Sequence, residues 1–296
     1  MRNFFTEIES NKSKTYIIIF FFTLFIVGLS YLASLYYGRG SFSFFLGLGL
    51  IISGVSSFAS YYYSDKMILA MSGAREIQRR DDPEIYNLVE NLCIGTGLPT
   101  PKVYIIEDTA MNAFATGRDP QHGVVCLTTG IISRLTKQEL EGVIAHELAH
   151  IGNYDIRLAS IVSVLVGTIV FISDWLTHGM FYGGGGEDRE LPAWMGILFI
   201  VILIASPIIA TLIQLAVSRN REYLADATAA SMTRYPEGLA SALEKISGDK
   251  EILEAANGAT AHLYISNPLQ NSGKFLANLF STHPPIDERI KRLREM

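Results

Sequence analysis

The sequence has few charged residues and few cysteines, and each shortage excludes a class of protein. Only 18% of its 296 residues are charged and 49% are hydrophobic, a balance that is unusual for a soluble globular chain and indicates a membrane protein. The formal net charge is -5 and there is no long basic run, so nucleic acid is not an expected partner. Two cysteines, Cys93 and Cys126, cannot build a disulfide framework, and we expect both to be unpaired core residues.

Four apolar stretches without charged residues are long or nearly long enough to cross a bilayer, which takes about 20 helical residues. They cover residues 15–38, 41–64, 158–173 and 191–218, and we place the last two spans at 158–176 and 193–217. The first stretch lacks the small-residue cleavage site of a signal peptide, so we interpret it as an anchor. Because only a short link separates the first two spans, we expect them to form an antiparallel hairpin, and the last two a second hairpin.

Lys and Arg residues gather on one side of these predicted spans. They are Arg2, Lys12 and Lys14 before the first span, Lys66, Arg75, Arg79 and Arg80 after the second, and Arg219 and Arg221 after the fourth. The positive-inside rule therefore predicts that both termini and the large polar segments face the cytoplasm.

The polar segment between the hairpins, residues 65–157, has the pattern of an α+β unit. Asp82-Pro83 favours the start of a helix that ends near Gly97. Short apolar or β-branched runs at 103–106, 111–116 and 124–128 predict the strands of a small sheet. Further along, Thr136 and Glu139 form a capping-box pattern in front of apolar residues at helical spacing. Helices are also predicted over most of 219–260 and over 285–296.

The predicted helix after Thr136 contains His146-Glu147-Leu148-Ala149-His150, an HExxH motif. Residues four apart lie on one face of a helix, so both imidazoles can reach one metal ion, and Glu147 is placed to act as a general base. The alternative is a chance pentapeptide whose histidines pair with polar groups in the core.

A catalytic zinc with two histidine ligands needs a third protein ligand. Cys93 or Cys126 could supply a thiolate in principle, but Glu222, just after the fourth span, is the better candidate. Asp226 shares its helix face and could accept the free N–H of a metal-bound histidine. The alternative is a solvated helix face paired with Arg219 and Arg221.

The predicted spans and the predicted metal site agree with each other. His150 precedes the third span and Glu222 follows the fourth, so two crossings return the chain to the same side of the membrane. We therefore divide the chain into a hairpin at 1–64, a catalytic domain at 65–157, a second hairpin at 158–218, and a helical part of the catalytic domain at 219–296.

The motifs together resemble a known family. HELAHIGNYD at 146–155 and SRNREYLADATAA at 218–230, with MNAFATG at 111–117 and STHPPIDERIKRL at 281–293, resemble the HtpX-type membrane zinc metallopeptidases, relatives of the prenyl-protein CAAX proteases. The resemblance implies a mainly α membrane protein with four transmembrane helices and a cytoplasmic, zincin-like α+β domain with a small β-sheet.

The resemblance also implies roles for particular residues. His146, His150 and Glu222 would bind one Zn²⁺ per chain, Glu147 would be the catalytic base, and Asp226 would support a ligand.

Three further residues receive weaker roles from the resemblance. Asn112 would lie beside the substrate groove and Arg219 would have a possible substrate role there, whereas His283 would stabilise the oxyanion. The alternatives are a turn for Asn112, an interfacial charge for Arg219 and an ordinary loop residue for His283.

The implied activity is hydrolysis of damaged or misfolded membrane proteins, in quality control and the stress response, at a prokaryotic cytoplasmic (inner) membrane. Its partners would be membrane-protein substrates and the lipid bilayer. Two alternatives stay open. One is a CAAX-type peptidase that processes lipidated C-termini, and the other is a non-catalytic membrane scaffold or transporter that retains a metal site.

Overall fold

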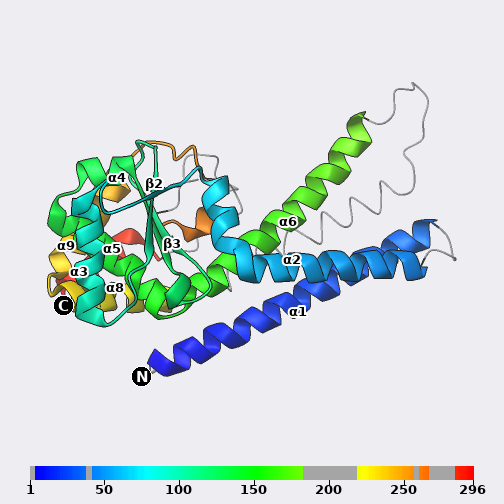
Figure 1. The fold of residues 1–296 in the computed structure, drawn as a ribbon, viewed down its shortest axis with the longest axis horizontal. Helices are drawn as coiled ribbons and strands as arrows, with labels where there is room; N and C mark the ends of the chain where they lie inside the picture. Colours follow the sequence, from blue (N-terminus) through cyan, green and yellow to red (C-terminus); the bar gives the residue numbers. More distant parts are fainter. Residues whose placement is uncertain (1–3, 38–41, 183–218, 257–259, 267–283) are drawn as a thin grey trace.

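A small mixed sheet lies at the centre of the globular body (Figure 1). The computed structural model describes residues 4–37, 42–182, 219–256, 260–266 and 284–296, and within them four strands form this sheet. The strands are β1 (Arg75–Ile77), β2 (Lys102–Ile106), β3 (Ala113–Thr116) and β4 (Val124–Thr128). Their order is β1-β2-β4-β3, with β2 parallel to β4 and antiparallel pairing at both edges. β3 is therefore an edge strand.

The structure confirms the three predicted strands and adds β1. All five residues of β4 are buried, as a strand covered on both faces requires. β1 was not predicted because Arg-Glu-Ile is short and largely charged, and it becomes a strand only by pairing with β2.

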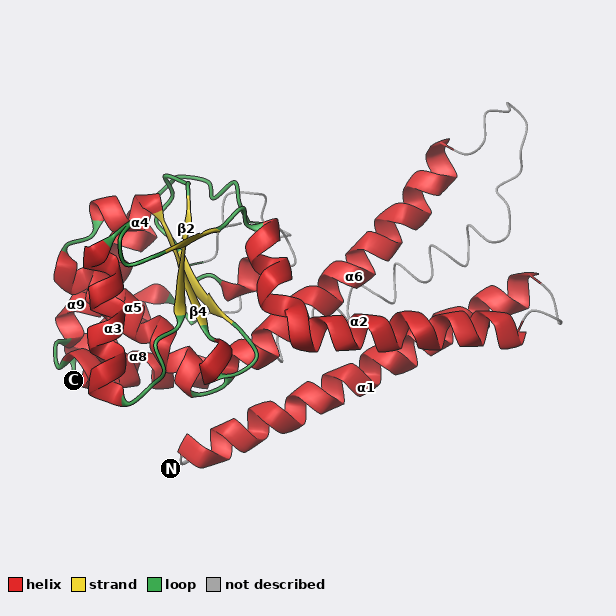
Figure 2. Cartoon of the chain, in the orientation of Figure 1, coloured by secondary structure: helices red, strands yellow, loops and turns green. Residues whose placement is uncertain are grey.

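Helices pack against the sheet, and most of them lie together on one side of it in Figure 2. The main ones are α3 (Pro83–Thr96), α5 (Lys137–Gly152), α8 (Arg219–Thr233), α9 (Pro236–Gly248) and α11 (Ile286–Arg294). Shorter elements are α4 (Thr129–Arg134) and the 3₁₀ turns η1 (Pro120–His122) and η2 (Ala261–Leu263). Buried apolar residues of the sheet and these helices, including Val125, Ile144 and Leu243, form one core.

Local signals set the ends of two of these helices. The Asp82 side chain accepts a hydrogen bond from the N–H of Ile85 at the start of α3, and Gly97, at a φ of 72°, ends it in the left-handed region. Thr136 and Glu139 form the predicted capping box at the start of α5. Both predicted helix starts are confirmed.

The prediction that 219–260 is mostly helical is confirmed, because α8 and α9 cover most of this segment. Within the segment predicted as mostly helical, 219–260, α9 ends at Gly248 and residues 249–256 have no regular helix. Asp249 explains the end, because its carboxylate accepts the backbone N–H groups of Met111 and Glu251 and so holds the chain in a turn.

Three long helices extend away from the body: α1 (Phe4–Tyr37), α2 (Phe42–Met71) and α6 (Asp155–Tyr182). α1 and α2 run antiparallel (Figure 1), and the apolar residues Ile18, Phe22 and Ile26 of α1 belong to one buried cluster with residues of α6. Within the described residues, we find no helix that is both long and apolar enough to cross a membrane. The predicted span at 193–217 lies outside the described residues.

Candidate metal centre

Helix α5 presents His146 and His150 on one face, a turn apart. The α-helix turns by about 100° per residue, so residues four apart point in nearly the same direction. Their Nε2 atoms are 3.2 Å apart, and the rings meet edge to face. His146 is 1% exposed, whereas the side chain of His150 is 16% exposed. The two nitrogens thus face one small space at the edge of the core.

Glu222 enters the same space from α8, which packs against α5. One carboxylate oxygen is 3.8 Å from His146 Nε2, and the other is 3.5 Å from His150 Nε2. One ligand atom from each of the three residues lies within 4.8 Å of the others, a group that could hold a metal ion. Glu222 is buried, so the alternative of a solvated helix face does not describe it.

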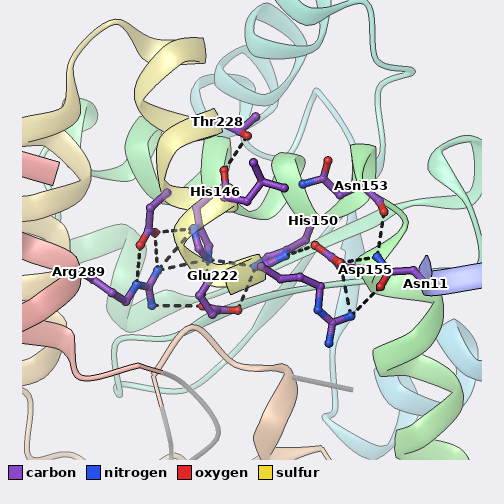
Figure 3. Close-up of polar contacts among 11 residues, drawn as sticks. Asn11, His146, His150, Asn153, Asp155, Glu222, Thr228 and Arg289 are labelled. Carbon is purple, nitrogen blue, oxygen red and sulfur yellow. Dashed lines mark hydrogen bonds and ion pairs between the residues drawn. The ribbon is translucent and has the colours of Figure 1, made fainter. Parts of the chain in front are cut away.

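Asp226, one turn after Glu222, orients His146. Its Oδ1 is 3.0 Å from His146 Nδ1, and Arg289 of α11 holds the carboxylate through Nε and Nη2 at 2.9 and 2.7 Å (Figure 3). Burial would raise the pKa of Asp226, but the charge of Arg289 and the hydrogen bond with His146 lower it to about 2. Asp226 is therefore ionised at neutral pH.

His150 has a carboxylate partner as well. Tyr154, at a left-handed φ of 60°, turns the chain so that α6 begins at Asp155. Asp155 Oδ2 is 3.0 Å from His150 Nδ1. Burial would lower the pKa of His150, but this hydrogen bond and the charge of Glu222 raise it to about 9 in the metal-free protein.

The donor set fits a zinc ion. Each histidine uses Nδ1 for a carboxylate, which selects the tautomer whose Nε2 can bind a metal. Two imidazole nitrogens and one carboxylate oxygen form a known catalytic zinc set. Around them lie more carboxyl groups (Glu147, Asp155, Glu222 and Asp226) than guanidinium groups (Arg221 and Arg289), a balance that suits a cation.

Glu147 lies between the two histidines in sequence and is 2% exposed. It lies near β3, where the backbone N–H of Ala115 lowers the pKa of its carboxyl group slightly. Burial raises the pKa of Glu147 to about 7, and the nearby charge of Glu222 acts in the same direction. A carboxyl group with such a pKa can both take up and release a proton near neutral pH.

The structure places the remaining predicted residues as follows. Asn112 is buried just before β3, where its side chain pairs with the backbone N–H and C=O of Ser266. Arg219 is exposed at the first residue of α8. His283 lies outside the described residues.

The two cysteines are placed as the sequence predicted. Cys93 and Cys126 are free and buried, and burial raises the pKa of both thiols. Neither belongs to the group that could hold a metal.

Sequence reasoning missed Arg289, Asp155 and Asn11. Arg289 belongs to a short helix rich in charge that reads as a solvated surface, yet it is 0% exposed. Asp155 follows His150 by five residues, and that spacing was the one available signal for it. Nothing in the sequence pointed to Asn11.

A helix with two histidines four apart and a glutamate between them, set beside a small mixed sheet, is the arrangement by which metallopeptidases hold zinc. The fold and the site therefore define a zincin-like metallopeptidase.

The chain belongs to peptidase family M48, which matches residues 79–296. Among curated relatives, the Protease HtpX homolog of Dictyoglomus thermophilum is 47% identical over 297 residues, 99% of this chain and 95% of that protein. The Protease HtpX homolog of Tropheryma whipplei (strain Twist) is 46% identical over 99% of this chain and 98% of its own length. The one from Streptococcus uberis is 40% identical, covering 99% of each chain.

Among solved structures, the crystal structure of S. mikatae Ste24p aligns with a TM-score of 0.44 and 20% identity. The alignment covers 84% of this chain and 64% of that one. The resemblance to HtpX-type peptidases that the motifs predicted is confirmed by the relatives.

Proposed function

We propose that this metallopeptidase is an endopeptidase that binds one Zn²⁺ through His146, His150 and Glu222. One observation carries the proposal: three ligand atoms from two helices lie within 4.8 Å of one another, and both histidines are oriented by carboxylates on their far nitrogens. When bound, zinc acts as a Lewis acid that polarises a peptide carbonyl and makes water more acidic.

The protein's own groups supply the proton transfers. Glu147 takes a proton from the attacking water and delivers it to the leaving amine, for which a pKa of about 7 is suitable. Asp226 and Asp155 keep the two imidazoles in one tautomer throughout. Arg289 stays charged and keeps Asp226 in place.

We propose that the substrate binds in an extended conformation along β3. β3 is an edge strand, and on its side away from β4 its own chain already pairs at Ala113, whereas Glu147 lies near Ala115 further along the strand. Ala113 C=O accepts the N–H of Ile265, and Asn112 pairs with the next peptide group. This edge thus has the hydrogen-bonding groups that an extended peptide requires. Arg219 and His283 remain candidates for contacts with substrate and oxyanion.

We further propose that the chain is anchored in a prokaryotic cytoplasmic membrane by the four predicted spans, with the catalytic parts 65–157 and 219–296 on the cytoplasmic side. Large apolar side chains on α1 and α2, among them Phe20, Phe21 and Ile51, are more than half exposed, as a lipid-facing surface requires. Where α2 meets the body, Arg118 and Arg157 lie over the rings of Tyr62 and Tyr61, a typical composition for a membrane interface. Release of the full chain from membranes by alkaline carbonate would contradict the anchoring.

Given the proposed membrane location, we infer that the peptidase acts on misfolded or damaged membrane proteins, in quality control and stress response. The test is proteolysis of an unfolded membrane protein and of casein by the purified chain in detergent, with zinc. Glu147→Gln should bind zinc as the wild type does but lose at least about 100-fold in rate, the lower end for general-base catalysis. Full activity of zinc-loaded Glu147→Gln would refute the assignment.

A further inference from the structure

Asn11, in the first helix, is far from the metal centre in sequence, but it contacts residues that support the centre. It is 1% exposed, and its Nδ2 donates to Asp155 Oδ1 at 2.7 Å and to the C=O of Asn153 at 3.3 Å (Figure 3). A buried amide in a helix otherwise rich in apolar residues needs such partners. Here the partners belong to the turn that follows the HExxH helix.

Arg221 binds the oxygen of the same Asn11 side-chain amide. Its Nη1 donates to Asn11 Oδ1 at 3.1 Å and lies 3.5 Å from Asp155 Oδ1. Arg221 immediately precedes Glu222 in α8. Asn11 therefore joins α1, the start of α6 and the start of α8 at one buried point.

The two oxygens of Asp155 have different partners. Oδ2 accepts from His150 Nδ1, while Oδ1 is held by Asn11 and Arg221. With Oδ1 held, the carboxylate cannot rotate away from the imidazole. The contacts therefore run from Asn11 through Asp155 to His150, and they set the direction of His150 Nε2.

The position of Asn11 does not depend on this contact alone. Further along α1, Ile18, Phe22 and Ile26 pack against apolar residues of α6, the helix that begins with Asp155. The apolar packing sets the two helices side by side, and the hydrogen bonds set their register. Asn11 also lies outside residues 79–296, the region that matches the peptidase family.

We propose that Asn11 is a positioning residue of the metal centre, so that the N-terminal helix is part of the metal site as well as an anchor. The inference rests on the proposed zinc site. Loss of Asn11 should leave the three ligands and Asp155 present but loosen the hold on His150. Zinc affinity should fall by about 10-fold, the lower end of the loss seen when the direct partner of a metal-bound histidine is removed, because Asn11 acts through Asp155.

The experiment measures zinc affinity of the full chain in detergent by competition with a chromophoric chelator. Asn11→Leu removes the amide at similar size, and Asn11→Ser is a smaller change in case the leucine disturbs folding. Thr15→Val is the matched control, because Thr15 is similarly buried one turn along α1, but among the described residues its hydroxyl donates only to the C=O of Asn11. Visible spectra of the Co²⁺-loaded proteins report ligand geometry independently of affinity.

We expect the Asn11 variants to bind zinc about 10-fold more weakly with an altered Co²⁺ spectrum, and Thr15→Val to match the wild type. Equal affinity and spectra in all of these proteins would overturn the role of Asn11, as would an equal loss in Thr15→Val. A wild-type chain that binds no zinc would instead refute the proposed function, and this inference with it.

Discussion

At the scale of single residues, the notable feature is a fully buried guanidinium. Arg289 is 0% exposed, yet it makes a two-point contact with Asp226 and lies 3.4 Å from Glu222 Oε2. A buried charge is tolerated when its partners satisfy it, and removal of one partner leaves the other uncompensated. Arg289 thus determines whether Asp226 can stay ionised beside His146.

Replacement of Arg289 should accordingly be costly. For Arg289→Met we expect a loss of about 3–5 kcal/mol in the free energy of unfolding, because the Asp226 carboxylate stays buried without its partner. Arg289→Lys should recover only part of this, since an ammonium cannot reproduce the two-point contact. Urea unfolding of the metal-free proteins measures both.

The control lies on the same helix. Arg292 is about half exposed, pairs with Glu288 one turn away and lies over the ring of Tyr223, so Arg292→Gln should cost no more than about 1 kcal/mol. If Arg289→Met and Arg292→Gln lowered the free energy of unfolding by equally small amounts, the buried ion pair would contribute no more to stability than the exposed one.

At the scale of elements, the site is assembled by several helices that meet at α5. α5 carries two of the proposed ligands, α8 the third, and α11 and α6 supply Arg289 and Asp155. α9 does not contribute to the site, but it packs closely along α5. At Gly142 an added Cβ would lie 2.7 Å from the backbone N of Leu239, so the two helices touch without a side chain between them.

Gly142→Ala should therefore separate α5 from α9. The strain should outweigh the better helix propensity of alanine and destabilise the fold by about 1–3 kcal/mol, with some loss of zinc affinity because α5 moves. Gly248→Ala is the comparison, since an added Cβ there meets nothing within 4 Å, and it should be neutral or slightly stabilising. Thermal unfolding distinguishes the two, and a Gly142→Ala protein as stable as the wild type would show that α9 can shift freely.

At the scale of the whole molecule, distant parts of the chain are joined by a few polar groups that are buried or partly buried. Asp249, at the end of α9, accepts the backbone N–H of Met111 before β3 and pairs with Arg134 of α4. Burial would raise the pKa of Asp249, but these hydrogen bonds and the charge of Arg134 outweigh it and hold the pKa below its ordinary 3.8.

A lowered carboxyl pKa predicts the direction of the pH dependence. The stabilisation by Asp249 is fully present above the unfolded pKa of 3.8 and is lost as the pH falls through the lower, folded value. Asp249→Asn should cost about 1–3 kcal/mol at pH 7, and this difference from the wild type should shrink in acid, where both side chains are neutral. Unfolding measured from pH 7 down to about pH 3 tests it, with the exposed Asp287→Asn as control; a difference that stays constant with pH would contradict it.

Much of the local structure could be predicted because its causes lie within a few residues. The capping box at Thr136, the helix start at Asp82 and the strands β2 and β4 depend on neighbouring side chains and on periodicity. β1 was missed because it needs β2 as a partner. The exact end of α9 had no signal in the sequence, because it depends on contacts of Asp249 with a distant segment.

The residues of the candidate site also fall into two groups, those that the sequence could predict and those that it could not. By itself the sequence determined that His146 and His150 share a helix face with Glu147 beside them, because helix geometry follows from spacing alone. It also indicated Glu222 and Asp226, whose spacing repeats that geometry.

Only the tertiary structure decided which groups support the metal centre. Asn11 and Arg289 lie more than a hundred residues from the histidines they help to place, and a charged or polar residue reads as surface until packing buries it. Such contacts depend on how α1, α6 and α11 dock, and docking is decided by the whole apolar core, which no local pattern contains.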